Sequence, residues 1–202
     1  MKALPKKLLP LILFAIAVTS VFCVQPAQGF TMTLQQVGSN VVANGSGAIN
    51  LTGLTKASTP FGGPSAIAAN LGFILTGAPS GGISDGYFGF TGPTSFGSGD
   101  VFLPNTGSGD LVGINGFLGF LFVPVGYVSG AALSDSMTFN NATLASLGVT
   151  PGTYIWTWGT GLPNQNFTLI IGAAGVPDGD STVSLLGCAL LGLAALRRKL
   201  SC

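Results

Sequence analysis

Histidine and glutamate are absent from the 202-residue chain, and only 6% of its residues are charged. Histidine is the commonest general base and a favoured zinc ligand, so its absence removes the groups that most often catalyse reactions or bind zinc. The three cysteines, Cys23, Cys188 and Cys202, all lie near the two ends, which leaves residues 30–175 without a thiol. Catalysis would depend on aspartate alone, and we therefore expect no enzyme, no cofactor and no metal site.

Basic residues are almost absent from the middle of the chain. Between residues 30 and 175 there is one cation, Lys56, together with four aspartates. These aspartates are Asp85, Asp100, Asp110 and Asp135. A nucleic-acid-binding protein needs a basic surface, so this charge distribution argues against a nucleic-acid partner.

The N-terminal region has the pattern of a secretory signal peptide. Three lysines precede an apolar run at residues 11–24, and the small-residue exit PAQG follows at residues 26–29. We predict that residues 1–29 are a signal peptide, recognised by the secretion translocon and cut by signal peptidase after Gly29, with Ala27 as the second small residue of the site. An uncleaved membrane anchor is the alternative, although an apolar run of 14 residues is short for one.

Residues 30–175 have the pattern of one all-β domain. Two Thr- and Val-rich runs within residues 31–53 are divided by Gly38, Ser39 and Asn40, which indicates a hairpin. Further short runs follow at residues 71–77, 86–90, 117–124, 136–141, 152–159 and 166–172, separated by turn-forming residues. Short strands with frequent turns predict an antiparallel β-sandwich or jelly-roll-like domain, in which Tyr154 can reach back to the preceding corner.

Three aromatic residues alternate along one predicted strand. Tyr154, Trp156 and Trp158 would all lie on one face of a regular strand. If the rings are buried, they belong to the core, which is the usual place for large aromatic side chains. If they are exposed, they form a flat surface for sugar rings, and the chain would be a carbohydrate-binding module.

Two aspartates occupy a repeated sequence. GSGD occurs at residues 97–100 and 107–110, ending in Asp100 and Asp110. A pair of carboxylates can serve glycoside hydrolysis or bind calcium, but the spacing matches neither an EF-hand loop nor the calcium-binding nonapeptide repeat. The simpler interpretation is that each aspartate closes a Gly-Ser turn.

The last 27 residues have three parts. An acidic VPDGD stretch comes first, followed by an apolar segment at residues 183–196 and then a basic end. At 1.5 Å per residue a helix over the apolar segment is ~21 Å long, against ~30 Å of hydrocarbon, so it is a short transmembrane helix. The basic end, Arg197, Arg198 and Lys199, favours the cytoplasmic side and thus a weak stop-transfer segment. A buried terminal helix is the alternative.

This order of parts resembles the PEP-CTERM sorting signal in its VPDSG-CTERM variant. Val176, Pro177 and Asp178 match the motif of the variant, whereas Gly179 and Asp180 replace its Ser-Gly. Residues 181–200 are similar to the helix and basic end of such tails. The body is also similar to that of small PEP-CTERM proteins at residues 46–54, 126–130 and 150–159.

The resemblance implies recognition by exosortase, a membrane-embedded protease or transpeptidase that cleaves near the motif. It also implies a Gram-negative-type bacterium in which a membrane-anchored precursor becomes a protein of the cell surface or of the exopolysaccharide matrix. We therefore expect an exported, non-enzymatic surface protein with a signal peptide at residues 1–29, a β-sandwich at residues 30–175 and a sorting signal at residues 176–202. A secreted carbohydrate-binding module is the second hypothesis, and a hydrolase is the third.

Overall fold

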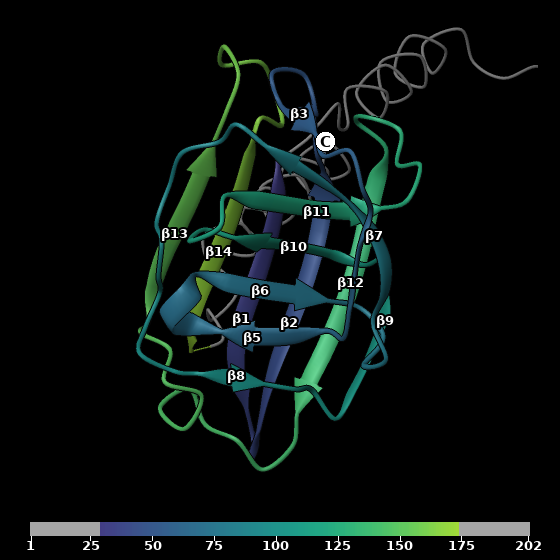
Figure 1. Cartoon of the computed structure of the whole chain (residues 1–202). Coiled ribbons are helices and arrows are strands. Elements are labelled where there is room, and N and C mark those ends of the chain that lie inside the picture. Colours follow the sequence, from purple (N-terminus) through teal and green to yellow (C-terminus); the bar gives the residue numbers. More distant parts are fainter. Residues whose placement is uncertain (1–28, 174–202) are drawn as a thin grey trace, which may run out of the picture.

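The computed structural model describes residues 29–173, which form two β-sheets packed face to face (Figure 1). One sheet contains β1 (Phe30–Val37), β2 (Asn40–Ala48), β9 (Thr106–Gly109), β12 (Ala132–Phe139), β13 (Gly152–Thr157) and β14 (Asn166–Ala173). Its strand order is β13-β14-β1-β2-β12-β9. The prediction of an all-β fold is confirmed.

The second sheet has eight strands. These are β3 (Thr55–Lys56), β4 (Phe61–Gly63), β5 (Ala66–Ala68), β6 (Phe73–Thr76), β7 (Gly82–Phe88), β8 (Val101–Phe102), β10 (Val112–Asn115) and β11 (Phe120–Pro124). The order is β3-β7-β11-β10-β6-β5-β8, with β4 also paired to β7. A 3₁₀ turn at Ala69–Leu71 joins β5 to β6. In Figure 1 the central strands of this sheet cross those of the six-stranded sheet at a steep angle, as in orthogonal sandwiches.

The core between the sheets is formed by side chains that alternate along each strand between buried and outward-facing positions. In β1, Phe30, Met32 and Leu34 are fully buried, while Thr31 and Thr33 face outward. In β14, Phe167 and Leu169 are buried in the same way. The sequence shows the same alternation of apolar and polar residues, because successive side chains of a strand point to opposite faces of the sheet.

The predicted hairpin is present between β1 and β2. Val37 pairs with Asn40 across a two-residue loop, and Gly38 has a φ of +60°. A glycine in the first loop position permits a turn whose twist matches that of the strands.

One strand pair departs from the predicted antiparallel sheet. β1 lies between β2 and β14, and it pairs with β14 in parallel over seven positions, from Phe30 opposite Phe167 to Gln36 opposite Ala173. Inward and outward alternation is the same for a parallel and an antiparallel neighbour, so the sequence pattern contains no information on direction. The prediction of a wholly antiparallel sheet is therefore wrong at this strand pair.

The tyrosine corner is confirmed. The Tyr154 hydroxyl donates a 2.9 Å hydrogen bond to the carbonyl oxygen of Thr150, four residues upstream. Its ring also packs against Phe96, with centroids 5.8 Å apart. The bond fixes the entry of the chain into β13.

A carboxyl group is buried in the core. Asp135 lies on β12 between Gly45 of β2 and Gly109 of β9, with 5% of its surface exposed. A Cβ at Gly45 would lie 2.6 Å from Asp135 Oδ1 and from the Phe30 ring, so the glycine makes room for both side chains. Neither carboxyl oxygen accepts a well-formed hydrogen bond within the described residues. Burial therefore raises the pKa of Asp135 to about 7.

We predict that Asp135 makes stability fall as the pH rises. Between about pH 4 and 7 the folded chain keeps a proton that the unfolded chain has lost, so the free energy of unfolding decreases across this range by up to about 4 kcal/mol. The variant Asp135→Asn cannot ionise. Urea unfolding should show it to be more stable than the wild type at pH 8, with a much smaller difference at pH 4. Parallel pH profiles for the two proteins would contradict the buried, neutral carboxyl.

Candidate functional site

The predicted aromatic surface is in the core. Trp156 is fully buried and Trp158 is 6% exposed, while Tyr154 is partly buried against the same cluster. The Trp156 Nε1–H donates to the carbonyl oxygen of Pro93 at 2.7 Å. The Trp158 Nε1–H donates to the carbonyl oxygen of Asn50, also at 2.7 Å. These rings are not an exposed row, because a sandwich of this size fills its interior with its largest side chains.

The two repeated aspartates contact different parts of the molecule. Asp100 Oδ1 accepts a hydrogen bond from Asn70 Nδ2 at 2.9 Å, and Asp110 Oδ2 accepts one from the Ser134 backbone N–H at 2.8 Å. Each carboxylate thus binds a residue distant in sequence rather than closing its own Gly-Ser turn. Residues 29–173 contain no group of three or more Asp, Glu, His or Cys side chains placed to hold a metal ion.

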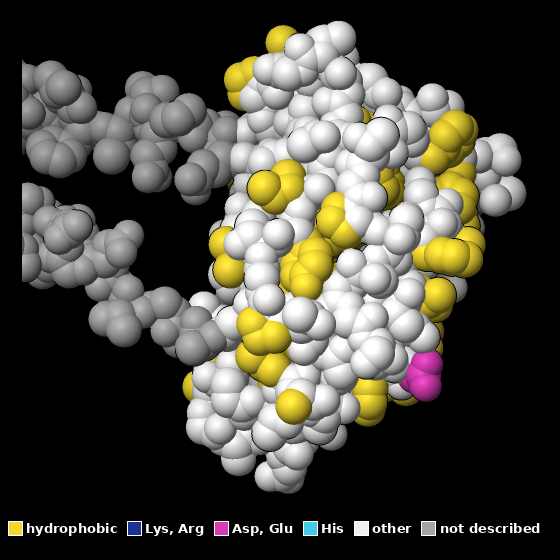
Figure 2. All heavy atoms as spheres, turned by 90° about the vertical axis from the view of Figure 1, so that its left-hand side faces the viewer, with side chains coloured by type: hydrophobic (Ala, Val, Ile, Leu, Met, Phe, Trp, Pro, Cys, Tyr) yellow, Lys and Arg dark blue, Asp and Glu magenta, His cyan; other side chains and the backbone are white. Residues whose placement is uncertain are grey.

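The cation of the described body is neutralised. Lys56 Nζ lies 2.7 Å from Asp85 Oδ2, which also accepts a hydrogen bond from the Gly126 N–H at 2.9 Å. The Lys56 ammonium and then the Gly126 N–H hold the pKa of Asp85 below its ordinary value. In Figure 2, which views the molecule from the β13 side, acidic colour appears only at one margin of the visible face and no basic side chain is seen.

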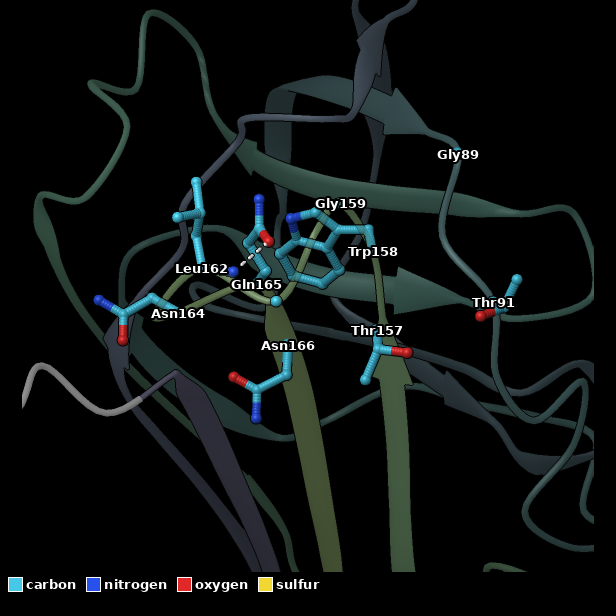
Figure 3. Close-up of a pocket in the computed structure, with 10 residues that line it drawn as sticks. Gly89, Thr91, Thr157, Trp158, Gly159, Leu162, Asn164, Gln165 and Asn166 are labelled. Atoms are coloured by element: carbon cyan, nitrogen blue, oxygen red, sulfur yellow. Dashed lines mark hydrogen bonds between the residues drawn. The ribbon is translucent and has the colours of Figure 1, made fainter.

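A hollow lies beside Trp158. Its volume is about 480 Å³, and every residue that lines it is uncharged. Thr157 at the end of β13 pairs with Thr91, in the segment after β7, through two backbone hydrogen bonds of 2.9 Å. This bridge links the six-stranded sheet to a segment leaving the other sheet. Figure 3 shows Thr157 and Asn166 on neighbouring strands below Trp158, with Thr91 across from Thr157. We call this hollow the Trp158 pocket.

Gln165 holds one side of the Trp158 pocket in place. Its Oε1 accepts hydrogen bonds from the backbone N–H groups of Thr160 and Leu162, at 3.1 and 2.8 Å. Its Nε2 donates to the carbonyl oxygen of Thr52 at 2.7 Å. The amide thus makes three hydrogen bonds, and it fixes the loop between β13 and β14.

Other polar side chains of the pocket have no hydrogen-bond partner within residues 29–173. These are the side chains of Thr91, Thr157 and Asn166, together with the buried Oδ1 of Asn164. Asn164 has a φ of +63°, a left-handed conformation that asparagine adopts more readily than most residues. A buried polar atom without a partner requires an explanation, and a bound ligand is one. The sequence pattern did not indicate this pocket, because its walls come from segments far apart in the chain.

The predicted sorting residues lie outside the described residues. This applies to Val176, Pro177, Asp178, Gly179 and Asp180, to the 183–196 segment, to Arg197, Arg198 and Lys199, and to Ala27 of the signal peptide. Gly29 is described and forms a bridge with Ala48 of β2. Residues 29–173 contain no helix that meets the length and hydropathy needed to cross a membrane.

Comparison with known proteins identifies the tail. Residues 175–200 match the family model of the VPDSG-CTERM motif. The chain carries a PEP-CTERM-like C-terminal sorting signal. Such a signal marks a protein as exported and directed to the surface. No curated protein and no solved structure matches the chain.

The buried position of the tryptophans gives a test. A Cβ at Gly92 would lie 2.4 Å from the Trp156 ring and 2.9 Å from the Ile155 carbonyl oxygen. We predict that Gly92→Ala lowers the free energy of unfolding by about 1–3 kcal/mol and changes the tryptophan emission, because a packed ring must move. Chemical denaturation followed by fluorescence would measure both effects.

The matched control is Gly63→Ala. Gly63 lies in β4, where an added Cβ meets nothing within 4 Å. This substitution should change stability by no more than about 0.5 kcal/mol and leave the emission unchanged. If Gly92→Ala were equally silent, the tight packing around Trp156 would be wrong.

Proposed function

We infer that the protein is an exported, non-enzymatic component of the cell surface or extracellular matrix, sorted and cleaved by an exosortase-type membrane protease. The observation that carries this proposal is the sorting-motif match at residues 175–200, which begins just after β14 ends at Ala173. Every strand of the described body therefore precedes the signal. A protease acting within residues 176–180 would remove none of them.

The N-terminal boundary supports the same interpretation. Cleavage after Gly29 would leave Phe30, the first residue of β1, as the first residue of the mature protein. The strand pairings of β1 with β2 and β14 begin at Phe30 and Thr31 and would all be kept. The secretion translocon, the signal peptidase and exosortase would thus act on segments at the two ends of a folded domain.

In the precursor, the apolar segment at residues 183–196 and the three basic residues after it would hold the chain in the membrane. A segment shorter than the hydrocarbon core is a weak anchor, which suits a temporary one. In this proposal the mature domain is then released or transferred to the outer surface of a Gram-negative-type cell, among its exopolysaccharides.

Substitution of the motif tests the proposal. We predict that the pair Pro177→Ala and Asp178→Ala blocks cleavage, so that a larger precursor accumulates in the membrane fraction of the native host. Immunoblots of fractionated cells would show the change in size and location. Thr59→Val, in an exposed loop of the body, is the control and should be processed as the wild type. Unchanged size and location of the motif variant would contradict exosortase processing.

A further inference from the structure

The two outer faces of the sandwich differ in chemistry. The eight-stranded sheet presents a cluster of phenyl rings with centroids 4.7–6.4 Å apart, formed by Phe61, Phe73, Phe88, Phe120 and Phe122. The six-stranded sheet presents hydroxyl and amide groups instead. We call the latter the hydroxyl face and define it by its two central rows.

The strand register fixes these rows. The first row runs across five strands, in the order Ile155, Thr168, Thr31, Ser46 and Ser134. The second runs across all six strands, in the order Thr153, Ile170, Thr33, Asn44, Ser136 and Ser108. Residues directly opposite each other in a ladder share a face. Eight of the eleven side chains carry a hydroxyl, one carries an amide, and none is charged.

The hydroxyl face leads into the Trp158 pocket. Thr157 and Asn166 are direct partners at the β13–β14 pair, two residues beyond Ile155 and Thr168 of the first row. Both also line the pocket. The face and the hollow are therefore one continuous uncharged surface, flat over the sheet and concave at its end.

This surface suits a ligand with regularly spaced hydroxyl groups. Neighbouring strands lie about 4.8 Å apart, so each row is a regular series of groups that both donate and accept hydrogen bonds. An anionic polymer would find no unpaired cation within residues 29–173, because Lys56 is neutralised by Asp85. A hollow of about 480 Å³ with unoccupied polar side chains and a tryptophan has the size and chemistry to hold a sugar ring.

The position of the pocket in the fold agrees with such a role. β14 begins at Asn166, in the pocket, and ends at Ala173, where the chain continues toward the sorting signal. Seven residues of extended strand separate these points by about 23 Å. A chain held by its C-terminal signal would thus carry the pocket at the end of the sandwich far from the point of attachment.

We propose that the Trp158 pocket and the hydroxyl face bind a neutral polysaccharide, with one sugar unit in the pocket and the adjoining chain across the sheet. This differs from a row of exposed aromatic rings, since Trp158 contributes only the wall of a hollow. The recognition is by hydroxyl and amide groups, and the ligand class is set by the lack of charge.

Affinity gel electrophoresis and tryptophan fluorescence of the purified full-length chain test the proposal. The probes are the neutral polymers dextran, laminarin and galactomannan, with alginate as the anionic comparison. At least one neutral polymer should bind and change the tryptophan emission, and alginate should not. Failure of all three neutral polymers, or binding of alginate alone, would overturn the proposal.

Two variants locate the binding surface. Thr157→Val removes a pocket hydroxyl with little change of shape and should weaken binding roughly three- to tenfold. Ser46→Lys places a long charged side chain on the exposed centre of the hydroxyl face and should weaken binding at least as much.

Thr59→Val and Thr59→Lys, away from both surfaces, are the matched controls and should bind as the wild type. Thermal melts establish that each variant is folded. If neutral polymers bind but both surface variants retain wild-type affinity, the site is elsewhere and the proposal is wrong.

These results are independent of tail processing. A protein that binds polysaccharide but keeps its C-terminus would refute exosortase cleavage alone. A correctly processed protein that binds none of the neutral polymers would refute the polysaccharide site alone.

Discussion

The parallel pairing of β1 with β14 holds the first and last strands of the described body side by side at the centre of a sheet. Seven residue pairs form this ladder, and the strands also supply the buried Phe30 and Phe167, whose rings lie 5.3 Å apart. The pairing joins the two ends of the described body. The proposed signal peptide and the sorting motif lie outside residues 30–173, so their removal would leave every described strand in place. Since the strands are parallel, the two margins of the body lie at opposite ends of the sheet.

Low charge is the second feature on which the molecule depends. The sandwich buries two carboxyl groups, Asp85, which is paired with Lys56, and Asp135, so most of its surface is hydroxyl, amide and apolar. Such a surface gives little electrostatic steering, and recognition must depend on hydrogen bonds and shape. The hydroxyl face and the phenyl cluster on the opposite sheet are two distinct consequences of this composition.

Local features were predictable from the sequence. The β1–β2 hairpin follows from Gly38 and the flanking alternation, the tyrosine corner from the position of Tyr154, and the sorting signal from a linear motif. Features that depend on distant segments were not predictable. The direction of β14 against β1 leaves no trace in the alternation. Asp135 shares the inward register of Leu133, Met137 and Phe139, but its residue type argues against burial, because aspartate is almost never fully buried. The Trp158 pocket requires Thr91 and Thr157 to meet across the two sheets, which no local pattern indicates.

In the proposed function a folded domain lies between two processing sites. The most direct measurement is the intact mass of the protein recovered from its native cell surface, with mapping of both terminal peptides. If both cleavages occur, the recovered chain begins at Phe30 and ends within residues 176–180. A recovered chain that still contains Cys202 would contradict the proposed function, because the C-terminal segment would then be a lasting part of the protein rather than a signal that is removed.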